Sequence, residues 1–214
     1  MEITLYYAPN TCALAPYVTL TEARADFTVR PLNYRKREHF TPEYLKINPK
    51  HKVPSLVVDG RVLTENVAIH EWVNRMFPAA KLLPDDPWDY AQAVALHSWC
   101  ASGIHPYLSR INSPGKVSEN PAAHESVIKL ATEVLHEQFK IGDDRLAGRE
   151  YFFDHFTAPD AHFYWCCRRA GQLGVDVSGF PNVAAHYKRM EQRPSVKKFL
   201  AYENEINEKF AKAG

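Results

Sequence analysis

The hydrophobic and polar positions of this 214-residue chain divide it into a mixed region and a helical region. Near the start, short apolar runs at residues 3–7 and 27–32 predict strands, and the spacing of residues 13–24 predicts a helix between them. A strand, a helix and a second strand in such a short segment form a βαβ unit. We therefore expect the two strands to pair in parallel through a right-handed crossover.

A β-hairpin and a helix are predicted next. Residues 55–58 and 61–63 are apolar enough for strands. Asp59-Gly60 between them is a strong turn signal, because glycine accepts a positive φ without a steric penalty. Residues 64–77 then have the spacing of an amphipathic helix. The order βαβ followed by ββα is that of a thioredoxin-like domain.

Only helical periods follow the proline- and aspartate-rich residues 78–87, which predict a linker. The expected helices lie at residues 90–110, 122–141, 159–171, 183–192 and 195–211. Gly103 and Pro106 mark a bend in the first of them. Thr157 and Asp160 have the spacing of a capping box, so we interpret Asp160 as structural.

The predicted fold class is therefore α/β plus all-α. A thioredoxin-like domain is expected over residues 1–77, and a helical-bundle domain is expected over residues 88–214.

Composition excludes several classes of protein. The net charge is +1 with acidic and basic residues mixed, so neither a nucleic acid nor a membrane surface is an expected partner. No apolar run is long enough for a membrane span, and the start lacks the pattern of a secretory leader. The four cysteines have no zinc-ligand spacing. We expect a reduced, cytoplasmic protein without a metal.

Two features suit the binding of a small zwitterion. Val53 precedes Pro54 and is therefore extended, so its backbone N–H and C=O can pair with a peptide-like ligand. Glu65 and Asn66 stand at a predicted helix start, where a carboxylate can accept from an ammonium group and free N–H groups favour an anion. On spacing alone, a hairpin packed on a helix, with Glu65 only complementing the dipole, is the stronger interpretation.

The motifs themselves add a family resemblance. The Val-Pro-Ser-Leu segment at 53–56 and the Leu-Thr-Glu-Asn-Val-Ala-Ile segment at 63–69 resemble the glutathione S-transferase superfamily. The first residues, with a cysteine at position 12, resemble its bacterial beta class. The resemblance covers essentially the whole chain.

The resemblance implies glutathione as cosubstrate. It implies that Pro54 is cis, that the Val53 backbone pairs with the cysteinyl part of glutathione, and that Glu65 binds the γ-glutamyl end. Asn66 stands where the superfamily often has serine, and it can still donate an N–H. It further implies a homodimeric detoxification enzyme that transfers glutathione to a small hydrophobic electrophile.

Other functions remain open at this point. One is a glutathione-dependent thiol–disulfide oxidoreductase using Cys12, and another is a non-catalytic protein that binds glutathione or another ligand. A third is an interaction module of the kind fused to elongation factors. Such a module has no need of Cys12, Glu65 or the Val-Pro pair.

Cys12 is the leading candidate for the thiol chemistry. The predicted helix start, capped by Asn10 or Thr11, is expected to lower the pKa of Cys12. A mixed disulfide with glutathione would follow, as in beta-class relatives, whereas a buried, inert thiol is the alternative. Asn10, Thr11 or a backbone N–H could also hold the glutathione thiolate. Tyr7 is interpreted as structural.

Two further roles follow from the resemblance. Lys36 matches a lysine that beta-class relatives use against the glycine carboxylate, although Arg35 or Arg37 could replace it, and a solvated basic loop is the alternative. Beta-class relatives also carry a catalytic histidine where this chain has Ala101. His97 and His105 lie one turn away on either side, and His105 is the better candidate.

Overall fold

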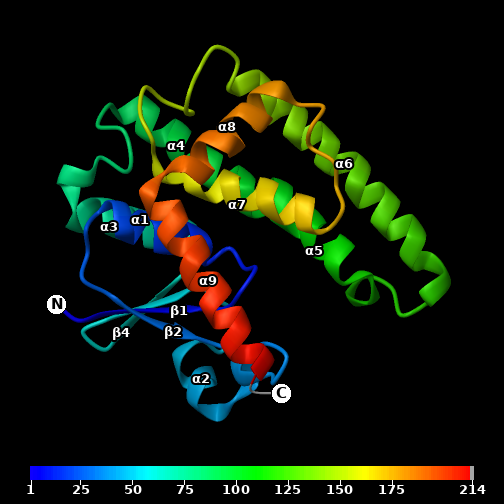
Figure 1. Cartoon of the computed structure of the whole chain (residues 1–214), viewed down its shortest axis with the longest axis horizontal. Helices are drawn as coiled ribbons and strands as arrows, with labels where there is room; N and C mark the ends of the chain where they lie inside the picture. Colours follow the sequence, from blue (N-terminus) through cyan, green and yellow to red (C-terminus); the bar gives the residue numbers. More distant parts are fainter. Residues whose placement is uncertain (213–214) are drawn as a thin grey trace. The chain divides into compact units, whose positions relative to one another are not determined.

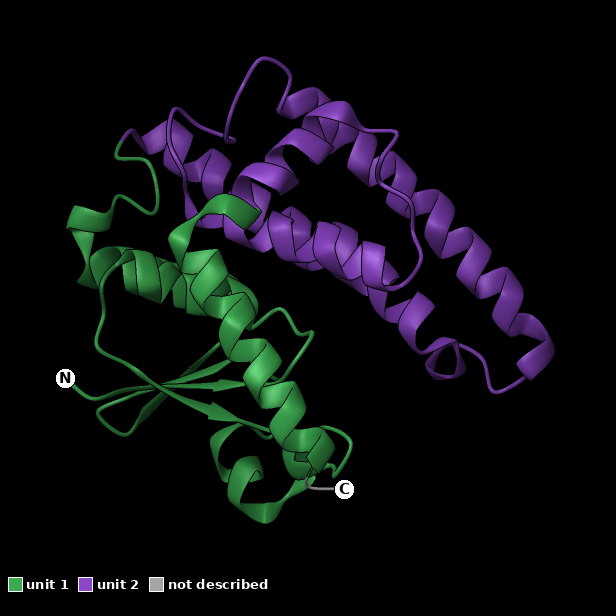
Figure 2. Ribbon diagram, viewed as in Figure 1, with its two compact units in different colours: residues 1–85, 191–214 green, residues 86–190 purple. Residues whose placement is uncertain are grey.

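The computed structural model describes residues 1–212, and their contacts group into two compact units (Figure 2). Of the described residues, the first unit takes 1–85 and 191–212, and the second takes Asp86–Met190. The last helix, α9 (Pro194–Lys212), therefore groups with the N-terminal residues, which its helical pattern alone did not indicate. None of the described helices is both long enough and apolar enough to cross a membrane.

The first unit is built on a four-stranded sheet in the order β2-β1-β3-β4. In chain order, the strands and helices that precede α9 in this unit are β1 (Ile3–Tyr7), α1 (Leu14–Glu22), β2 (Thr28–Pro31), η1 (Glu38–Phe40), α2 (Pro42–Ile47), β3 (Ser55–Val58), β4 (Arg61–Thr64), α3 (Asn66–Met76) and η2 (Pro78–Ala80). Strand β1 pairs with β2 in parallel and with β3 antiparallel. In Figure 1, α1 and α3 lie on one side of the sheet and α2 on the other. This topology confirms the predicted thioredoxin-like fold.

The predicted hairpin joins β3 to β4. Asp59 and Gly60 have φ angles of 47° and 78°, so both central residues of the turn lie in the left-handed region. Glycine at the second position removes the steric penalty there, and such turns match the twist of paired strands. The hairpin was therefore predictable from two residues.

An aromatic cluster holds α9 against β1 and α1. The Tyr17 ring stacks on Tyr202 at a centroid distance of 5.5 Å and meets Phe199 edge-on at 5.2 Å. Tyr7 at the end of β1 lies 5.7 Å from Phe199. Because Tyr7 and Phe199 are fully buried, the cluster extends the apolar core of the sheet to the last helix.

Two carboxylates add polar links to the same interface. Glu203 Oε1 accepts from the Tyr7 hydroxyl and from the Asn10 backbone N–H, each at 2.9 Å. Glu22 at the end of α1 accepts from Arg193 through two nitrogens, at 3.0 and 2.9 Å. Glu203 is only 1% exposed, and a polar group buried to this extent is costly unless it is hydrogen-bonded.

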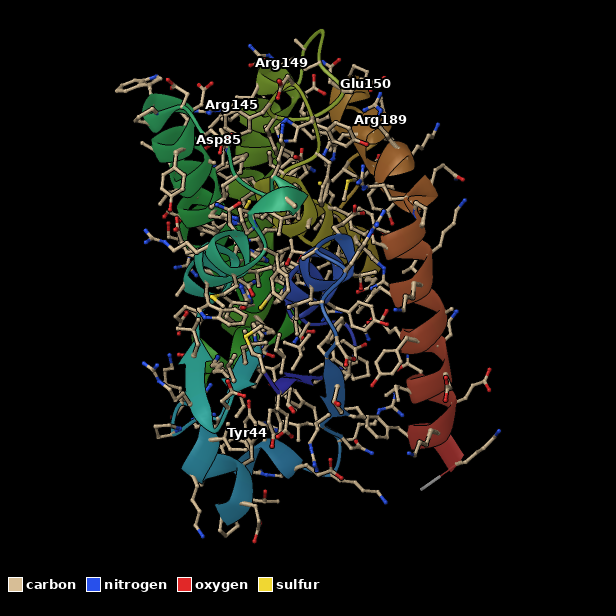
Figure 3. All side chains as sticks on the ribbon, turned by 90° about the vertical axis from the view of Figure 1, so that its left-hand side faces the viewer. Tyr44, Asp85, Arg145, Arg149, Glu150 and Arg189 are labelled. Atoms are coloured by element: carbon tan, nitrogen blue, oxygen red, sulfur yellow. The ribbon has the colours of Figure 1, made fainter. Side chains whose placement is uncertain are left out.

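In the second unit, every regular element of the described chain is helical, as predicted. The elements are α4 (Pro87–Trp99), the π-helical turn η3 (Cys100–Ile104), α5 (His105–Asn112), η4 (Pro114–Lys116), η5 (Pro121–Ala123), α6 (His124–Arg145), α7 (Ala158–Gln172) and α8 (Pro181–Gln192). In the loop before α7, the Glu150 carbonyl accepts from Arg189 of α8 at 2.6 Å (Figure 3).

The capping box at the start of α7 is confirmed. Thr157 and Asp160 exchange the two predicted side-chain to backbone hydrogen bonds. The buried Asp160 carboxylate also accepts from the Phe152 N–H at 3.1 Å and lies 3.0 Å from His186 Nε2. Asp160 thus joins three segments of the helical unit.

The long helix expected over residues 90–110 is interrupted. Residues Cys100–Ile104 form a π-helical turn between α4 and α5. Pro106 has no N–H with which to continue the regular ladder, which explains why the helix changes its hydrogen bonding just before it. Gly103 is required in this turn, because a Cβ there would lie 2.8 Å from the Trp99 ring.

Replacement of Glu203 by alanine is expected to lower the free energy of unfolding by about 1–3 kcal/mol, because it removes the acceptor of the buried Tyr7 hydroxyl and of the part-buried Asn10 N–H. Glu203→Gln should lose less, since its amide oxygen can still accept from both. Chemical denaturation measures the difference, with Glu208→Ala on the exposed face of α9 as the control. An equal loss in Glu203→Ala and Glu208→Ala would contradict the assigned link.

Candidate functional site

Three segments of the first unit meet at Cys12. The Cys12 thiol lies 3.8 Å from the Val53 carbonyl oxygen, and it is 8% exposed. The Asn66 side-chain amide, at the start of α3, donates to the Cys12 carbonyl at 3.2 Å. The structure therefore brings together the cysteine, the residue before Pro54 and the start of α3, as the sequence motifs suggested.

The start of α1 differs from the prediction. The helix begins at Leu14 with Ala13 as its N-cap, and no side chain caps it. The Thr11 hydroxyl instead donates to the Ala8 carbonyl at 2.6 Å, within the preceding turn. Asn10 adopts a left-handed φ of 62°. The expectation that Asn10 or Thr11 caps this helix is therefore wrong, because the helix begins only after Ala13 and the Thr11 hydroxyl bonds within the preceding turn.

The electrostatic environment of Cys12 also corrects an expectation. Burial raises the pKa of the Cys12 thiol from 9.0 to about 12, and the nearby Glu65 charge adds to this rise. The Cys12 backbone N–H and the Asn66 side chain oppose the effect of burial more strongly than Glu65 adds to it, and the charge of Lys52 opposes it least. The sequence indicated a helix start, which lowers a thiol pKa. It could not indicate that the side chain is buried, and desolvation dominates.

The Val53-Pro54 peptide bond is cis, as the resemblance implied. Its flanking residues are held by α2. The Asn48 amide donates to the Lys52 carbonyl at 2.8 Å and to the Ser55 hydroxyl at 3.1 Å. The Tyr44 hydroxyl donates to the same carbonyl and lies 3.0 Å from the Ser55 hydroxyl (Figure 3). This network fixes the backbone on both sides of Val53.

Sequence reasoning missed this supporting network. Tyr44 lies on α2, Asn48 is the C-cap residue of that helix four positions later, and both are almost fully buried. The spacing of four residues on a short helix is the available signal, because it places both side chains on one face. Nothing in that spacing identifies the carbonyl that they hold.

Glu65 is the N-cap residue of α3, as predicted, and its backbone is strained. Its φ of 71° is rare for a residue with a side chain, and such conformations cost on the order of 1–3 kcal/mol. Its carboxylate forms an ion pair with the Lys50 ammonium, which also donates to the Thr64 hydroxyl at 2.9 Å. The sequence analysis did not identify Lys50.

The side chains of Asn33 and Glu38 order the basic loop after β2, where the Glu38 carboxylate accepts from the Asn33 N–H at 2.7 Å. Asn33 Oδ1 accepts from the backbone N–H groups of Arg35 and Lys36 at 3.0 and 3.3 Å. The Arg37 guanidinium lies 4.7 Å above the Phe40 ring, which engages it in a cation–π contact. Lys36 is exposed, and its role toward a glycine carboxylate stays a prediction.

The histidines of the long helix belong to the second unit. His105 begins α5, and its ring meets that of Trp165 at a centroid distance of 4.6 Å. His97 is 1% exposed and lies 3.5 Å from His162, measured between the Nδ1 atoms. Ala101 lies in the π-helical turn. Burial of His97 leaves His105 as the better candidate, and its catalytic role stays a prediction.

The contacts of Tyr7 and of the metal-ligating residue types within the described chain bear on two further roles. The Tyr7 hydroxyl donates to Glu203, and the residue is fully buried, which supports its structural interpretation. Within residues 1–212, no group of three or more histidine, cysteine, aspartate or glutamate side chains could hold a metal ion.

Comparison with known proteins gives consistent matches. The model of the glutathione S-transferase N-terminal domain matches residues 1–75, and that of the C-terminal domain matches residues 100–194. The chain is 28% identical over 202 residues to glutathione S-transferase GstA of Escherichia coli O157:H7, covering 93% of this chain and 98% of that protein.

Solved structures agree with these sequence matches. A glutathione S-transferase from Xylella fastidiosa has a TM-score of 0.89 and 27% identity. A glutathione S-transferase of a sphingomonad, complexed with glutathione, has a TM-score of 0.82 and 28% identity. Each likeness covers 94% of this chain and 98% of the solved chain.

The raised pKa of Cys12 predicts a distinct pH dependence of alkylation. The rate of iodoacetamide labelling should rise about tenfold per pH unit from pH 8 to 10 without levelling off, because only the thiolate reacts. Peptide mass spectrometry would follow Cys12 separately, and low exposure alone would slow labelling without changing this slope. A plateau near pH 7–8 would contradict the raised pKa.

The raised pKa of Cys12 also makes the free energy of unfolding depend on pH. Because the folded pKa exceeds the ordinary value of 9.0, the contribution of Cys12 is fully present below that pH. It is lost as pH rises toward about 12. Cys12→Ser should therefore show a smaller decline in unfolding free energy over that alkaline range.

Proposed function

The chain belongs to the glutathione S-transferase superfamily, and from this premise we propose that it transfers glutathione to a small hydrophobic electrophile. The observation that carries the proposal is the convergence of Cys12, the Val53 backbone and the start of α3. A related glutathione S-transferase was solved in complex with glutathione, which supports the choice of ligand.

Each part of glutathione has a proposed partner in the first unit. The N–H and C=O of Val53 pair with the cysteinyl backbone, in the manner of an added strand. The Glu65 carboxylate accepts from the γ-glutamyl ammonium, and the N–H groups at the start of α3 bind its carboxylate. The Asn66 amide donates to the Cys12 carbonyl, and Cys12 lies against Val53, so the start of α3 is linked to the segment that binds the cysteinyl backbone. Lys36 is proposed to pair with the glycine carboxylate.

The chemistry requires the thiolate of glutathione. Its thiol loses a proton to solvent, and its sulfur attacks the electrophile, so that a C–S bond forms and the leaving group departs with the electron pair. Because the pKa of Cys12 is raised to about 12, Cys12 is a neutral thiol at neutral pH. Cys12 therefore places no competing negative charge beside the glutathione sulfur. By the family resemblance, His105 stays the proposed catalytic histidine.

The neutral state of Cys12 also separates the two enzymatic alternatives. A thiol–disulfide oxidoreductase needs an attacking thiolate at the protein cysteine. A buried thiol with a pKa of about 12 supplies very little thiolate at neutral pH. The burial of Cys12 and the raised pKa that follows from it therefore favour conjugation over disulfide exchange. A cytoplasmic homodimer acting in detoxification completes the proposal, and light scattering that gave a mass of 24.5 kDa would contradict the dimer.

Glutathione is expected to raise the melting temperature by mass action. Glu65→Ala should abolish most of this shift, because the ammonium group of the ligand loses its carboxylate partner. Asp26→Ala, which removes an exposed carboxylate from the loop between α1 and β2, is the matched control. Differential scanning fluorimetry over a glutathione titration measures the shifts. An undiminished shift in Glu65→Ala would remove Glu65 from the site.

The proposed reaction is tested with chlorodinitrobenzene as the electrophile. Conjugation should be detectable in the unaltered protein and should persist within about tenfold in Cys12→Ser, because glutathione supplies the reacting thiolate. Reduction of a mixed disulfide should be weak in both proteins. Strong disulfide reduction that disappears in Cys12→Ser, without conjugation, would establish the oxidoreductase instead.

A further inference from the structure

The candidate ligand-binding residue Glu65 already holds a cation. The Lys50 ammonium contacts Glu65 Oε1, and both side chains are at least half exposed. Among residues 1–212, Lys50 is the only hydrogen-bond partner that the structure gives to the Glu65 carboxylate. The lysine thus occupies one side of the group that is proposed to accept the ligand's ammonium.

Lys50 is placed by its own segment. Its backbone N–H donates to Asn48 Oδ1 at 3.0 Å, and its ammonium donates to the Thr64 hydroxyl at 2.9 Å. Asn48 also holds the Lys52 carbonyl just before Val53. One buried asparagine therefore fixes both the backbone proposed to bind the cysteinyl part and the segment that carries Lys50.

The two charged groups have unused hydrogen-bonding capacity. An ammonium has three donors, and Lys50 uses two of them on Thr64 and Glu65. A carboxylate has two oxygens, and Lys50 contacts only Oε1 of Glu65. One donor of Lys50 and one oxygen of Glu65 can therefore act on a ligand without breaking the ion pair.

We propose that Lys50 is a specificity-determining residue that binds the α-carboxylate of the γ-glutamyl group while it remains paired with Glu65. The inference rests on the proposed function. The ligand's ammonium and carboxylate are attached to one carbon atom, so they approach Glu65 and Lys50 together. The four charges then alternate in a closed ring: Lys50, Glu65, the ligand ammonium and the ligand carboxylate.

This arrangement predicts selection for a zwitterion. A ligand with the ammonium alone would share Glu65 with Lys50 and crowd two positive charges around one carboxylate. A ligand with the carboxylate alone would leave the second oxygen of Glu65 facing a like charge. Only a group with both charges satisfies both side chains. The strained backbone of Glu65 is consistent with a carboxylate held in place for this purpose.

The test is a binding cycle between protein and ligand variants, measured by isothermal titration calorimetry. The proteins are the unaltered chain, Lys50→Met and Lys50→Arg, with Lys46→Met as a control that removes an exposed lysine from α2. The ligands are glutathione and its analogue without the γ-glutamyl α-carboxylate. Low and high salt distinguish a specific pair from general attraction.

Lys50→Met should weaken glutathione binding about tenfold, because it removes a hydrogen bond between charged groups at a partly exposed site. It should not weaken binding of the analogue, which lacks the carboxylate. Lys50→Arg should restore most of the affinity for glutathione, and Lys46→Met should bind as the unaltered protein does. Melting temperatures of the ligand-free variants would verify that each is folded.

Two outcomes would overturn the inference alone. Tighter glutathione binding by Lys50→Met would mean that Lys50 only competes for Glu65. An equal loss for glutathione and the analogue would mean that Lys50 does not recognise the carboxylate. Failure of the unaltered protein to bind glutathione would instead overturn the proposed function, and the inference with it.

Discussion

The hydrogen bond from the Asn66 amide to the Cys12 carbonyl is the interaction on which the site depends. It joins the start of α3 to the loop before α1 at a distance of 3.2 Å, inside the first unit. Cys12 in turn lies against the Val53 carbonyl. The same carbonyl also accepts from the Ala15 backbone N–H at 3.2 Å, so the Asn66 amide is the donor that ties it to a distant segment of the chain. Three segments far apart in the sequence thereby share one geometry.

That junction is supported from two directions within the same unit. Glu203 on α9 holds the β1–α1 loop through the Asn10 N–H, and it also holds the Tyr7 hydroxyl at the strand end. Tyr44 on α2 and Asn48 at its C-cap hold the carbonyl that precedes Val53. Both supports use buried polar groups, which are costly unless fully paired. The loops are consequently fixed by hydrogen bonds of high directionality rather than by apolar packing alone.

Local signals account for what the sequence predicted correctly. Asp59-Gly60 specifies its own turn, and Thr157 with Asp160 specifies its own helix start, so both follow from neighbouring residues. Glu203 lies 196 positions from Tyr7, and no pattern of short period connects them. The sequence predicted a lowered pKa for Cys12, and the structure gives a raised one for a related reason. Neighbouring residues indicate a helix start, whereas the burial of a side chain depends on the packing of the whole unit. The family resemblance supplied the proposed role of Glu65, but it gave no indication of Lys50.

The charges around the junction separate binding from chemistry. Glu65 contributes to the raised pKa of Cys12, and pairing of Glu65 with a ligand ammonium would remove part of that contribution. Burial is the larger cause, however, and binding of a ligand over the site would exclude still more water from the thiol. Cys12 therefore stays neutral whether or not Glu65 is paired. On the proposed assignment, Glu65 and Lys50 discriminate among ligands by charge, while the sulfur that reacts belongs to the ligand itself.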